Sequence, residues 1–232
     1  DHDLPLELAP REIVGPESKL AVGDGAMLAR VEAQEALDAA AVRFPASRWH
    51  APVIAAVAAS YQSPTYVEIG VWRGDCLSQV APHCGQAHGV DVSFERVEHD
   101  VGAARLWQLP SDEFFERYDG PAPDVIFVDG DHEYDQARRD AHNALAILAP
   151  QGVLFLHDTW PVFRAATARL LCGGVHRVVE ELEADASLEV VTIRRWPGLS
   201  LVTRRGPAFL SGQGQPAATA ATPAKARTTP AR

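Results

Sequence analysis

The sequence predicts an α/β fold, namely a doubly wound, mainly parallel seven-stranded sheet with helices on both faces and an antiparallel terminal strand. From Thr65 onward, strand-like and helix-like segments alternate, as they do where helices join the strands of a parallel sheet. The run Val125-Ile126-Phe127-Val128 is apolar throughout, which suits a strand buried on both faces. Gly70 and Gly74 follow the first strand-like segment, where such a sheet turns into its first helix.

Turn and capping residues bound the elements of the first half of the sheet. A helix over 51–61 carries Pro52 in its first turn, where a missing amide hydrogen is tolerated, and segment 62–64 ends it. Ser111 is suited to cap a short helix over 111–118. The strands expected here are 66–69, 87–91 and 105–108, and a helix over 74–81 joins the first two.

The second half of the sheet alternates in the same way and ends in a hairpin. A strand over 124–128 precedes a helix over 134–148, and Pro150-Gln151-Gly152 turns the chain into a strand over 153–156. A longer helix is expected over 162–185, with an interruption at Gly173-Gly174. Strands over 188–193 and 199–203 then form a terminal pair at the edge of the sheet.

The composition divides the chain into three parts. Residues 1–50 are expected to form an N-terminal arm followed by a helix from Ala26, which serves either as a lid or as the contact of a homo-oligomer. Residues 51–205 are expected to form the ligand-binding catalytic domain. Residues 206–232 are mostly Ala, Pro, Thr, Gly and Gln, so a disordered low-complexity tail is expected there.

Charge and cysteine content limit the partners and the compartment. The net charge of −10 repels phosphate backbones, so nucleic acid is not an expected partner. Since no run of about 18 apolar residues occurs, no membrane span is expected. The three cysteines, Cys76, Cys84 and Cys172, are odd in number and lack the spacing of a disulfide or zinc motif. A reducing, cytoplasmic location is the simplest expectation.

Glycines and polar residues gather at the carboxyl ends of the first three predicted strands, where ligands bind in sheets of this kind. Gly70 and Gly74 follow Glu68 with the spacing G-x-x-x-G, which differs from the G-x-G-x-x-G of nicotinamide and flavin enzymes. Glu68 either helps to anchor a ligand or caps the next helix. The residues expected along the ribose and the adenine of a bound nucleoside are Asp91, Ser111 and Asp112.

Two short polar motifs follow the fourth and fifth predicted strands. Asp129-Gly130-Asp131-His132 comes after the fourth strand, and His157-Asp158 comes after the fifth. Neighbouring strands lie about 5 Å apart, so these side chains are expected to converge on one rim of the sheet. Oxygen-rich clusters of this kind suit Mg²⁺.

Together with residues 67–74, these two motifs resemble a class I S-adenosylmethionine-dependent methyltransferase. More narrowly, they resemble the small-molecule, methyltransferase 24-type group that includes macrolide-sugar O-methyltransferases, over about residues 65–203. The resemblance implies a Rossmann-like fold and S-adenosylmethionine as the cofactor. The residues that it implies for cofactor binding are Glu68, Gly70, Gly74, Asp91, Ser111, Asp112 and Asp129.

The resemblance also implies roles for the acid and histidine residues. In metal-dependent relatives, one acid after strand four and two adjacent polar residues after strand five hold the metal, and these correspond to Asp129, His157 and Asp158. His157 departs from the usual acid, which leaves open an ion softer than Mg²⁺, a two-ligand site or no metal. His132 stands where similar enzymes hold the general base, so His132 and Asp129 form the implied catalytic set.

The resulting hypothesis is methyl transfer to a hydroxyl of a small polar natural product, such as a sugar or an antibiotic intermediate, with a divalent metal orienting the acceptor. N-methylation of an amino sugar or an aminoglycoside-type antibiotic is the alternative, and the acidic charge slightly favours it. A nicotinamide-dependent oxidoreductase is disfavoured, since both G-x-G-x-x-G and a Tyr-x-x-x-Lys pair are missing. The intact set of Asp129, His132 and Asp158 argues against a non-catalytic S-adenosylmethionine binder.

Overall fold

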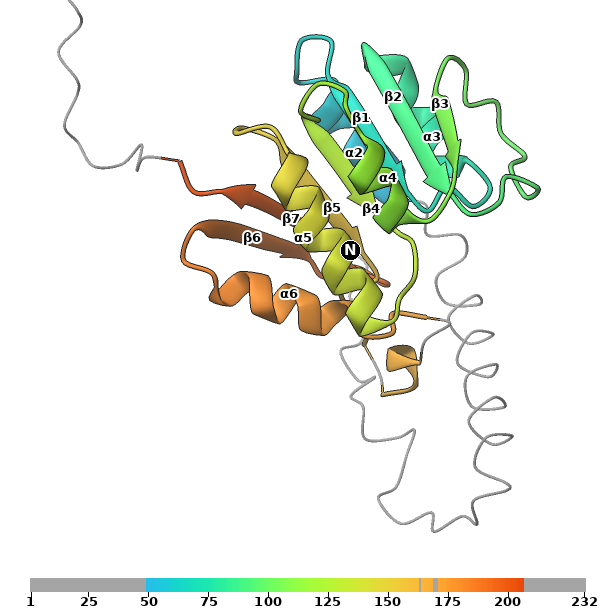
Figure 1. The fold of residues 1–232 in the computed structure, drawn as a ribbon. Helices are drawn as coiled ribbons and strands as arrows, with labels where there is room; N and C mark the ends of the chain where they lie inside the picture. Colours follow the sequence, from blue (N-terminus) through green and yellow to red (C-terminus); the bar gives the residue numbers. More distant parts are fainter. Residues whose placement is uncertain (1–48, 163, 169–170, 207–232) are drawn as a thin grey trace, which may run out of the picture.

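The computed structural model describes residues 49–162, 164–168 and 171–206, which form three layers with the sheet in the middle (Figure 1). The strand order of the seven-stranded sheet is β3-β2-β1-β4-β5-β7-β6. Strands β1 to β5 form a parallel sheet. Strand β7 lies between β5 and β6 and pairs antiparallel with both. The predicted fold class is therefore confirmed. All but the last two residues of the predicted N-terminal segment 1–50, including the start of its helix at Ala26, and nearly all of the predicted tail lie outside the described residues.

The elements agree with the predicted ones to within a few residues at most ends. The strands are β1 Thr65–Ile69, β2 Gln86–Asp91, β3 Arg105–Gln108, β4 Val125–Val128, β5 Val153–His157, β6 Leu188–Ile193 and β7 Leu199–Arg204. The helices are α2 His50–Ala58, α3 Asp75–Val80, α4 Ser111–Arg117, α5 Tyr134–Ile147 and α6 Val175–Ala184. Two short 3-10 helices cover Ala81–His83 and Arg164–Thr167.

The prediction of a long helix over 162–185 is wrong in one respect, because among the described residues of this range only the last part, α6, is an α-helix. Gly173 turns the chain into the left-handed region with a φ of +49°. A Cβ at this position would lie 2.1 Å from the carbonyl oxygen of His132. The close approach to the loop after β4 therefore requires glycine here, and α6 begins only after this glycine pair.

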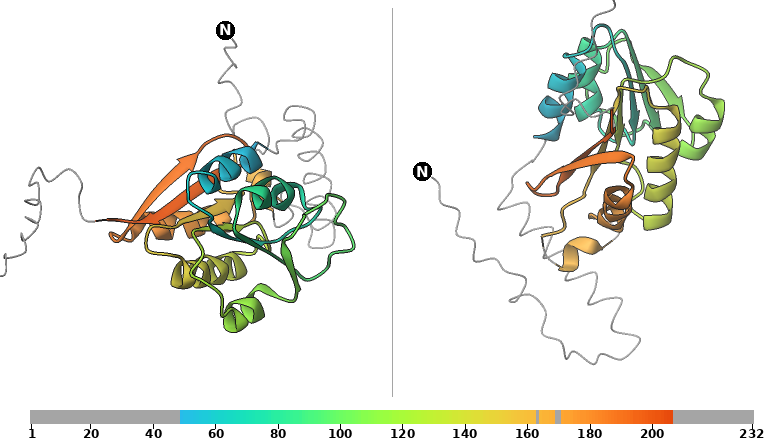
Figure 2. Two further views of the ribbon diagram at one scale, coloured as in Figure 1. Left: turned by 90° about the horizontal axis from the view of Figure 1, so that it is seen from above. Right: turned by 90° about the vertical axis from the view of Figure 1, so that its left-hand side faces the viewer.

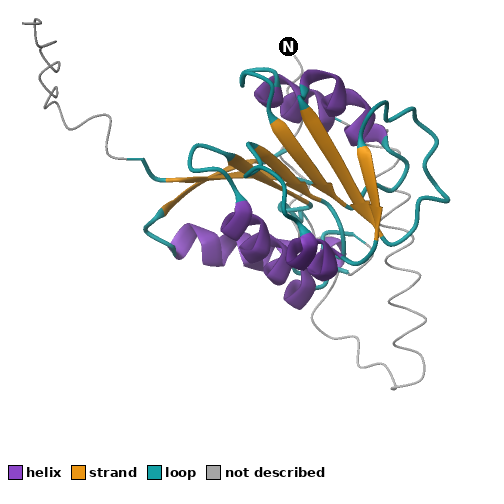
Figure 3. Cartoon of the chain, turned by 45° about the horizontal axis from the view of Figure 1, so that its top comes forward, coloured by secondary structure: helices purple, strands orange, loops and turns teal. Residues whose placement is uncertain are grey.

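Helices cover both faces of the sheet, as Figures 2 and 3 show. Helices α2 and α3 pack on one face against Tyr66 and Phe127, whereas α4, α5 and α6 pack on the other face against Val67 and Ile126. Adjacent residues of a strand point to opposite faces, so Tyr66 and Val67 belong to different cores. Since both faces are covered, a ligand reaches the central strands at their carboxyl ends.

The described residues contain no helix that is both long and apolar enough to cross a membrane. Cys76 and Cys172 are buried free thiols, and Cys84 is a half-buried one. Packing of the two apolar cores on either side of the sheet, rather than a covalent crosslink, holds the described part of the chain together.

Candidate functional site

A cavity of about 400 Å³ opens at the carboxyl ends of β1, β2 and β4. Five residues that were predicted to bind the cofactor line it together, namely Gly70, Asp91, Ser111, Asp112 and Asp129. They come from the ends of three strands and the start of α4, so the parallel sheet assembles the cavity from distant segments of the chain. A volume of this size is typical of small-molecule sites in proteins.

The first wall of the cavity is the tight passage of the chain after β1. Gly70 has a φ of +87°, and a Cβ there would lie 2.1 Å from the carbonyl oxygen of Asp129. The amide of Asp129 in turn donates a hydrogen bond to the carbonyl of Ile69 at 2.8 Å. Glycine is therefore needed both for the backbone conformation and for the close approach of the two strand ends.

Asp91 holds the glycine turn in place as well as lining the cavity. Its Oδ2 accepts hydrogen bonds from the backbone amides of Val71 and Trp72, at 2.9 and 3.0 Å. Trp72 has a left-handed φ of +50°, and its side chain, which also lines the cavity, is largely exposed. The carboxylate of Asp91 thus fixes a turn whose backbone conformation is otherwise unfavourable.

The far end of the cavity lies between the start of α4 and the first turns of α5. Ser111 is not the N-cap of α4, because Pro110 occupies that position and Ser111 is the first helical residue. Its hydroxyl instead accepts a hydrogen bond from Nε2 of Gln136 at 3.2 Å. Gln136 also donates to the buried Asp140 at 3.0 Å, and both side chains line the cavity. Sequence reasoning missed this pair, since its spacing on α5 is that of any helix face.

Glu68 and Gly74 do not line this cavity. Glu68 is fully buried on the opposite face of β1, where its Oε2 accepts a hydrogen bond of 2.5 Å from the hydroxyl of Tyr66. Burial raises the pKa of Glu68 to about 8, although the bond from Tyr66 opposes the shift. Gly74 has a φ of +81° and precedes the first residue of α3. Their role in cofactor binding stays a prediction, because Glu68 lies near the end of β1 and Gly74 lies just before α3, both outside the lining of the cavity.

The acid and histidine residues after β4 and β5 meet in one cluster, as their strand positions predicted. Nδ1 of His157 lies 3.0 Å from Oδ1 of Asp129 and 3.5 Å from Oδ1 of Asp158. Nε2 of His132 lies 2.9 Å from Oδ2 of Asp158 and 3.7 Å from Oδ1 of Asp129. The pairing of Val128 with Leu156 places the ends of β4 and β5 side by side, which produces this convergence.

Opposite charges compensate one another within the cluster. Burial alone would raise the pKa of Asp129 and of Asp158, but His157 and His132 hold both below the usual range. Burial likewise opposes charge on His132, yet the hydrogen bonds to Asp129 and Asp158 raise its pKa to about 10. The pKa of His157 is also raised well above its ordinary value, by the same two carboxylates. The cluster therefore favours two carboxylates paired with two imidazolium rings.

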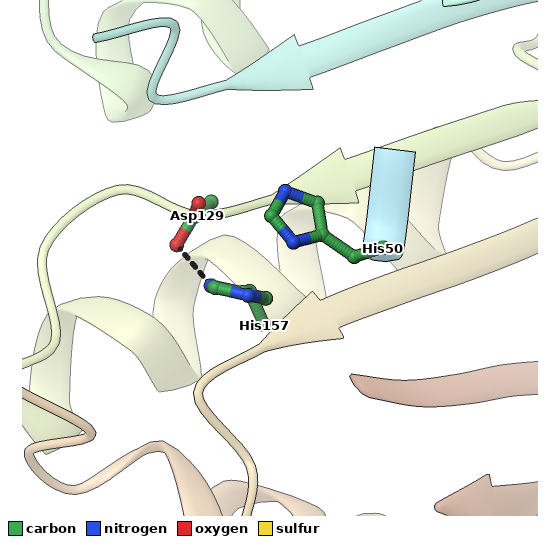
Figure 4. A group of neighbouring side chains, drawn as sticks. All are labelled: His50, Asp129 and His157. Carbon is green, nitrogen blue, oxygen red and sulfur yellow. Dashed lines mark hydrogen bonds and ion pairs between the residues drawn. The ribbon is translucent and has the colours of Figure 1, made fainter. Parts of the chain in front are cut away.

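The start of α2 adds His50 to this cluster. Its side chain is buried, and its ring centroid lies 4.3 Å from that of His157 and 5.5 Å from that of Phe127. Figure 4 shows His50, Asp129 and His157 converging from α2, β4 and β5. His50 falls in the segment 1–50 that the sequence assigns to the N-terminal arm. No local signal marks it as a site residue, because it follows no strand and matches no motif.

Two groups of three side chains in the described residues are close enough to hold a metal ion. His50, Asp129 and His157 each offer a ligand atom within 4.8 Å of the others, and so do Asp129, His132 and Asp158. The metal ligands implied by sequence, Asp129, His157 and Asp158, are thus divided between the two groups. Nε2 of His157 is buried without a hydrogen-bond partner among the described residues. The donor set therefore fits a divalent cation.

A second cavity, of about 390 Å³, lies beside His132. Its lining includes His132 and Tyr134 from the segment after β4, and Gly174 and Arg177 from the start of α6. His132 lines this cavity, whereas Asp129 lines the first one, and the two side chains approach each other to 3.7 Å. The acid and histidine cluster therefore lies between two cavities that are each large enough for part of a ligand.

Comparison by sequence matches residues 67–159 to a family model described as a methyltransferase domain. The matched segment begins in β1 and ends just after β5, so it contains the glycine turn, both polar motifs and all of the residues that line the first cavity. A sequence search among curated proteins finds no match to the chain.

Comparison by structure finds similar folds in solved proteins. Cofactor-bound Rv0187 from MTB has a TM-score of 0.59 and 15% identity, over 82% of this chain and 100% of that one. The O-methyltransferase from Bacillus cereus in complex with SAH has a TM-score of 0.56 and 16% identity, over 75% and 90%. TomG, an O-methyltransferase from Streptomyces achromogenes in complex with SAM, has a TM-score of 0.53 and 18% identity, over 79% and 91%. At these identities the likeness concerns the fold, which is that of class I methyltransferases.

We expect Glu68→Gln to stabilise the protein increasingly as the pH rises. The folded pKa of about 8 lies above the ordinary value of 4.5, so the folded state binds the proton more tightly than the unfolded state does. Between pH 4.5 and about pH 8, the free energy of unfolding of the wild type should therefore fall relative to that of Glu68→Gln, by up to about 1.4 kcal/mol per pH unit. Above the folded pKa, the difference between the two proteins should stay constant. Denaturant titrations at several pH values measure this difference.

The matched control for this prediction is Glu116→Gln, which removes an exposed carboxylate from α4. This variant should follow the wild-type stability at every pH. If Glu68→Gln also keeps the wild-type pH profile, the buried carboxyl is not the group that titrates.

Proposed function

We propose that this protein is an S-adenosylmethionine-dependent methyltransferase that transfers a methyl group to a hydroxyl of a small polar natural product, such as a sugar or an antibiotic intermediate. The observation that carries the proposal is the position of His132 and Asp129 between two cavities. One cavity would hold the methyl donor and the other the acceptor. The O-methyltransferase names of two similar structures support the hydroxyl acceptor, and TomG, which is involved in tomaymycin synthesis, supports a natural product.

The cofactor would occupy the first cavity, with its adenosine across the ends of β1 and β2. Asp91 would accept hydrogen bonds from the ribose hydroxyls, and Ser111 and Asp112 would border the adenine. The glycine turn would allow the ligand to approach the backbone at Gly70 without contacting a Cβ. When bound, S-adenosylmethionine supplies an electrophilic methyl group on a cationic sulfur.

His132 would accept the proton of the acceptor hydroxyl at Nδ1, because Nε2 faces the carboxylates of Asp158 and Asp129. The acceptor oxygen would bond to the methyl carbon that the cofactor supplies as the carbon–sulfur bond breaks, and the hydroxyl proton would pass to the imidazole. Asp158, 2.9 Å from Nε2, would orient the ring and stabilise the imidazolium that results. Holding donor and acceptor in line supplies much of the acceleration in such a reaction.

A divalent cation, Mg²⁺ or another ion, is part of the proposal, with Asp129, His157 and Asp158 as its ligands. When bound, such an ion supplies positive charge that orients a hydroxyl and favours its deprotonation. The positive charge of the ion would partly neutralise the carboxylates of Asp129 and Asp158. These carboxylates would then raise the pKa of His132 less than they do without the ion. A cation is thus compatible with the neutral imidazole that a general base requires.

Methylation of an amine, for example on an amino sugar, is the second candidate. The net charge of −10 and the carboxylates of the cluster favour a cationic acceptor over an anionic one. The same base would remove the ammonium proton before transfer. Analysis of the methylated product, by the position of the new methyl group on oxygen or nitrogen, distinguishes the two candidates.

We expect calorimetry to show one molecule of S-adenosylhomocysteine bound per chain, with micromolar affinity, and no binding of NAD. Asp91→Ala should weaken binding by roughly tenfold or more, because it removes charge-assisted hydrogen bonds to the ligand and to the turn. Asp119→Ala, which removes an exposed acid beyond α4, should bind like the wild type. Binding of NAD in place of S-adenosylhomocysteine would instead identify an oxidoreductase.

His132→Ala should reduce turnover by roughly 10² to 10⁴-fold, the usual contribution of a general base, and change S-adenosylhomocysteine affinity little. Release of S-adenosylhomocysteine from a panel of hydroxylated and amino sugars provides the assay. His142→Ala, which removes an exposed histidine of α5, is the control and should retain full turnover. If His132→Ala turns over at the wild-type rate, another group is the base.

Removal of divalent ions is expected to stop methyl transfer, and addition of Mg²⁺ or another divalent ion should restore it. The physical reason is the loss of the charge that orients the acceptor and favours its deprotonation. Turnover is measured before and after treatment with excess chelator, with S-adenosylhomocysteine affinity as the control for an intact cofactor site. Undiminished turnover in chelator would show that the acid and histidine cluster acts without a metal.

A further inference from the structure

We infer that His50, Asp129 and His157 form a binding site for a first-row transition-metal dication such as Zn²⁺ or Co²⁺. This inference rests on the proposed function for the use of the ion in methyl transfer. It changes that proposal in two ways, since His50 replaces Asp158 as the third ligand and a nitrogen-binding metal replaces Mg²⁺. The site then combines α2 with the ends of β4 and β5.

The spacing of the three side chains suits a single ion. Each offers one ligand atom, and these atoms lie within 4.8 Å of one another. Bonds from zinc to nitrogen and oxygen are about 2.1 Å long, so two ligand atoms on one ion lie roughly 3 to 4 Å apart. Small side-chain adjustments would therefore bring all three atoms into contact with one ion at the centre of the group in Figure 4.

The ring of His157 already faces Asp129 within the group. His157 is 9% exposed, and its Nδ1 lies 3.0 Å from Oδ1 of Asp129, so Nδ1 is the atom that an ion shared with Asp129 would bind. Metal binding would replace the proton between these two atoms. The side chain of Asp129 is 25% exposed and faces the first cavity, so an ion held here can be reached by solvent and by a further ligand.

The donor types select the metal. Two imidazoles and one carboxylate form the ligand set of many catalytic zinc sites, which keep one position open. Mg²⁺ instead prefers oxygen ligands and retains several waters. The other group, Asp129, His132 and Asp158, carries two carboxylates and one imidazole and would suit Mg²⁺ better. The choice of ion therefore distinguishes the two groups.

The packing around His50 holds its ring in the orientation that the site needs. The ring stacks on Phe127, with an angle of 29° between the planes. Trp49, the preceding residue, donates a hydrogen bond from Nε1 to the carbonyl of Trp196 at 3.0 Å, which ties the start of α2 to the segment between β6 and β7. A metal ligand held by packing in this way loses little conformational freedom on binding.

The test is metal binding to the full chain after its metal has been removed. We expect one Co²⁺ per chain, followed by visible absorption, and one Zn²⁺, followed by calorimetry, each bound roughly a hundredfold or more tightly than Mg²⁺. His50→Phe keeps an aromatic ring against Phe127 but removes both nitrogens, so it should weaken Co²⁺ binding by roughly tenfold or more. His142→Phe, on the exposed face of α5, should bind Co²⁺ like the wild type.

X-ray absorption at the zinc edge supplies a second measurement, which needs no variant. It should reveal two imidazole ligands in the wild type and one in His50→Phe, so a single imidazole in the wild type would overturn the inference. Unchanged Co²⁺ affinity in a folded His50→Phe, together with its loss in His132→Phe, would assign the ion to the other group and would also overturn it. S-adenosylhomocysteine binding by the same proteins tests the methyltransferase proposal separately, because neither measurement of the metal depends on it.

Discussion

The close approach of Gly70 to the backbone of Asp129 is the constraint on which the rest of the site depends. It brings the ends of β1 and β4 together so tightly that a Cβ would lie 2.1 Å from a carbonyl oxygen. The glycine turn then borders one side of the cavity, and Asp91 can fix that turn from β2 through two backbone amides. On the other side, the pairing of β4 with β5 carries Asp129 to His157 and Asp158. The first cavity and the polar cluster are thus two consequences of one strand arrangement.

The polar cluster is stable in a mostly buried place because its charges compensate. Asp129 and Asp158 alternate with His132 and His157 at distances from 2.9 to 3.7 Å. Removing one member would leave an uncompensated charge, which is costly where water is scarce. The same arrangement makes the cluster receptive to a cation, since a metal ion can replace a proton shared between an imidazole and a carboxylate.

Features set by neighbouring residues could be predicted from the sequence, and features set by distant contacts could not. The strands, the glycine turn and the convergence of Asp129 with His157 follow from hydrophobic pattern and strand order, which repeat in every parallel sheet. The glycine pair at 173–174 marks the predicted interruption of the helix over 162–185, whereas the contact of Gly173 with the loop after β4 has no local signal. The position of His50 beside His157 depends on how α2 packs over the sheet. Glu68 follows the two-residue alternation of β1 and faces away from the cavity. The glycine motif alone does not indicate which face of β1 carries its side chain.

Asp129 lines the first cavity, where the cofactor is proposed to bind, and also belongs to both groups that could hold a metal. Its single carboxylate would therefore lie near a cationic sulfur on one side and a dication on the other. Two positive ligands that share one negative group are energetically coupled, because each changes the electrostatic potential that the other experiences. By thermodynamic linkage, any factor by which the metal changes cofactor affinity must equal the factor by which the cofactor changes metal affinity. The sulfur loses its positive charge during methyl transfer. The affinity for the metal would therefore differ before and after each round of methylation.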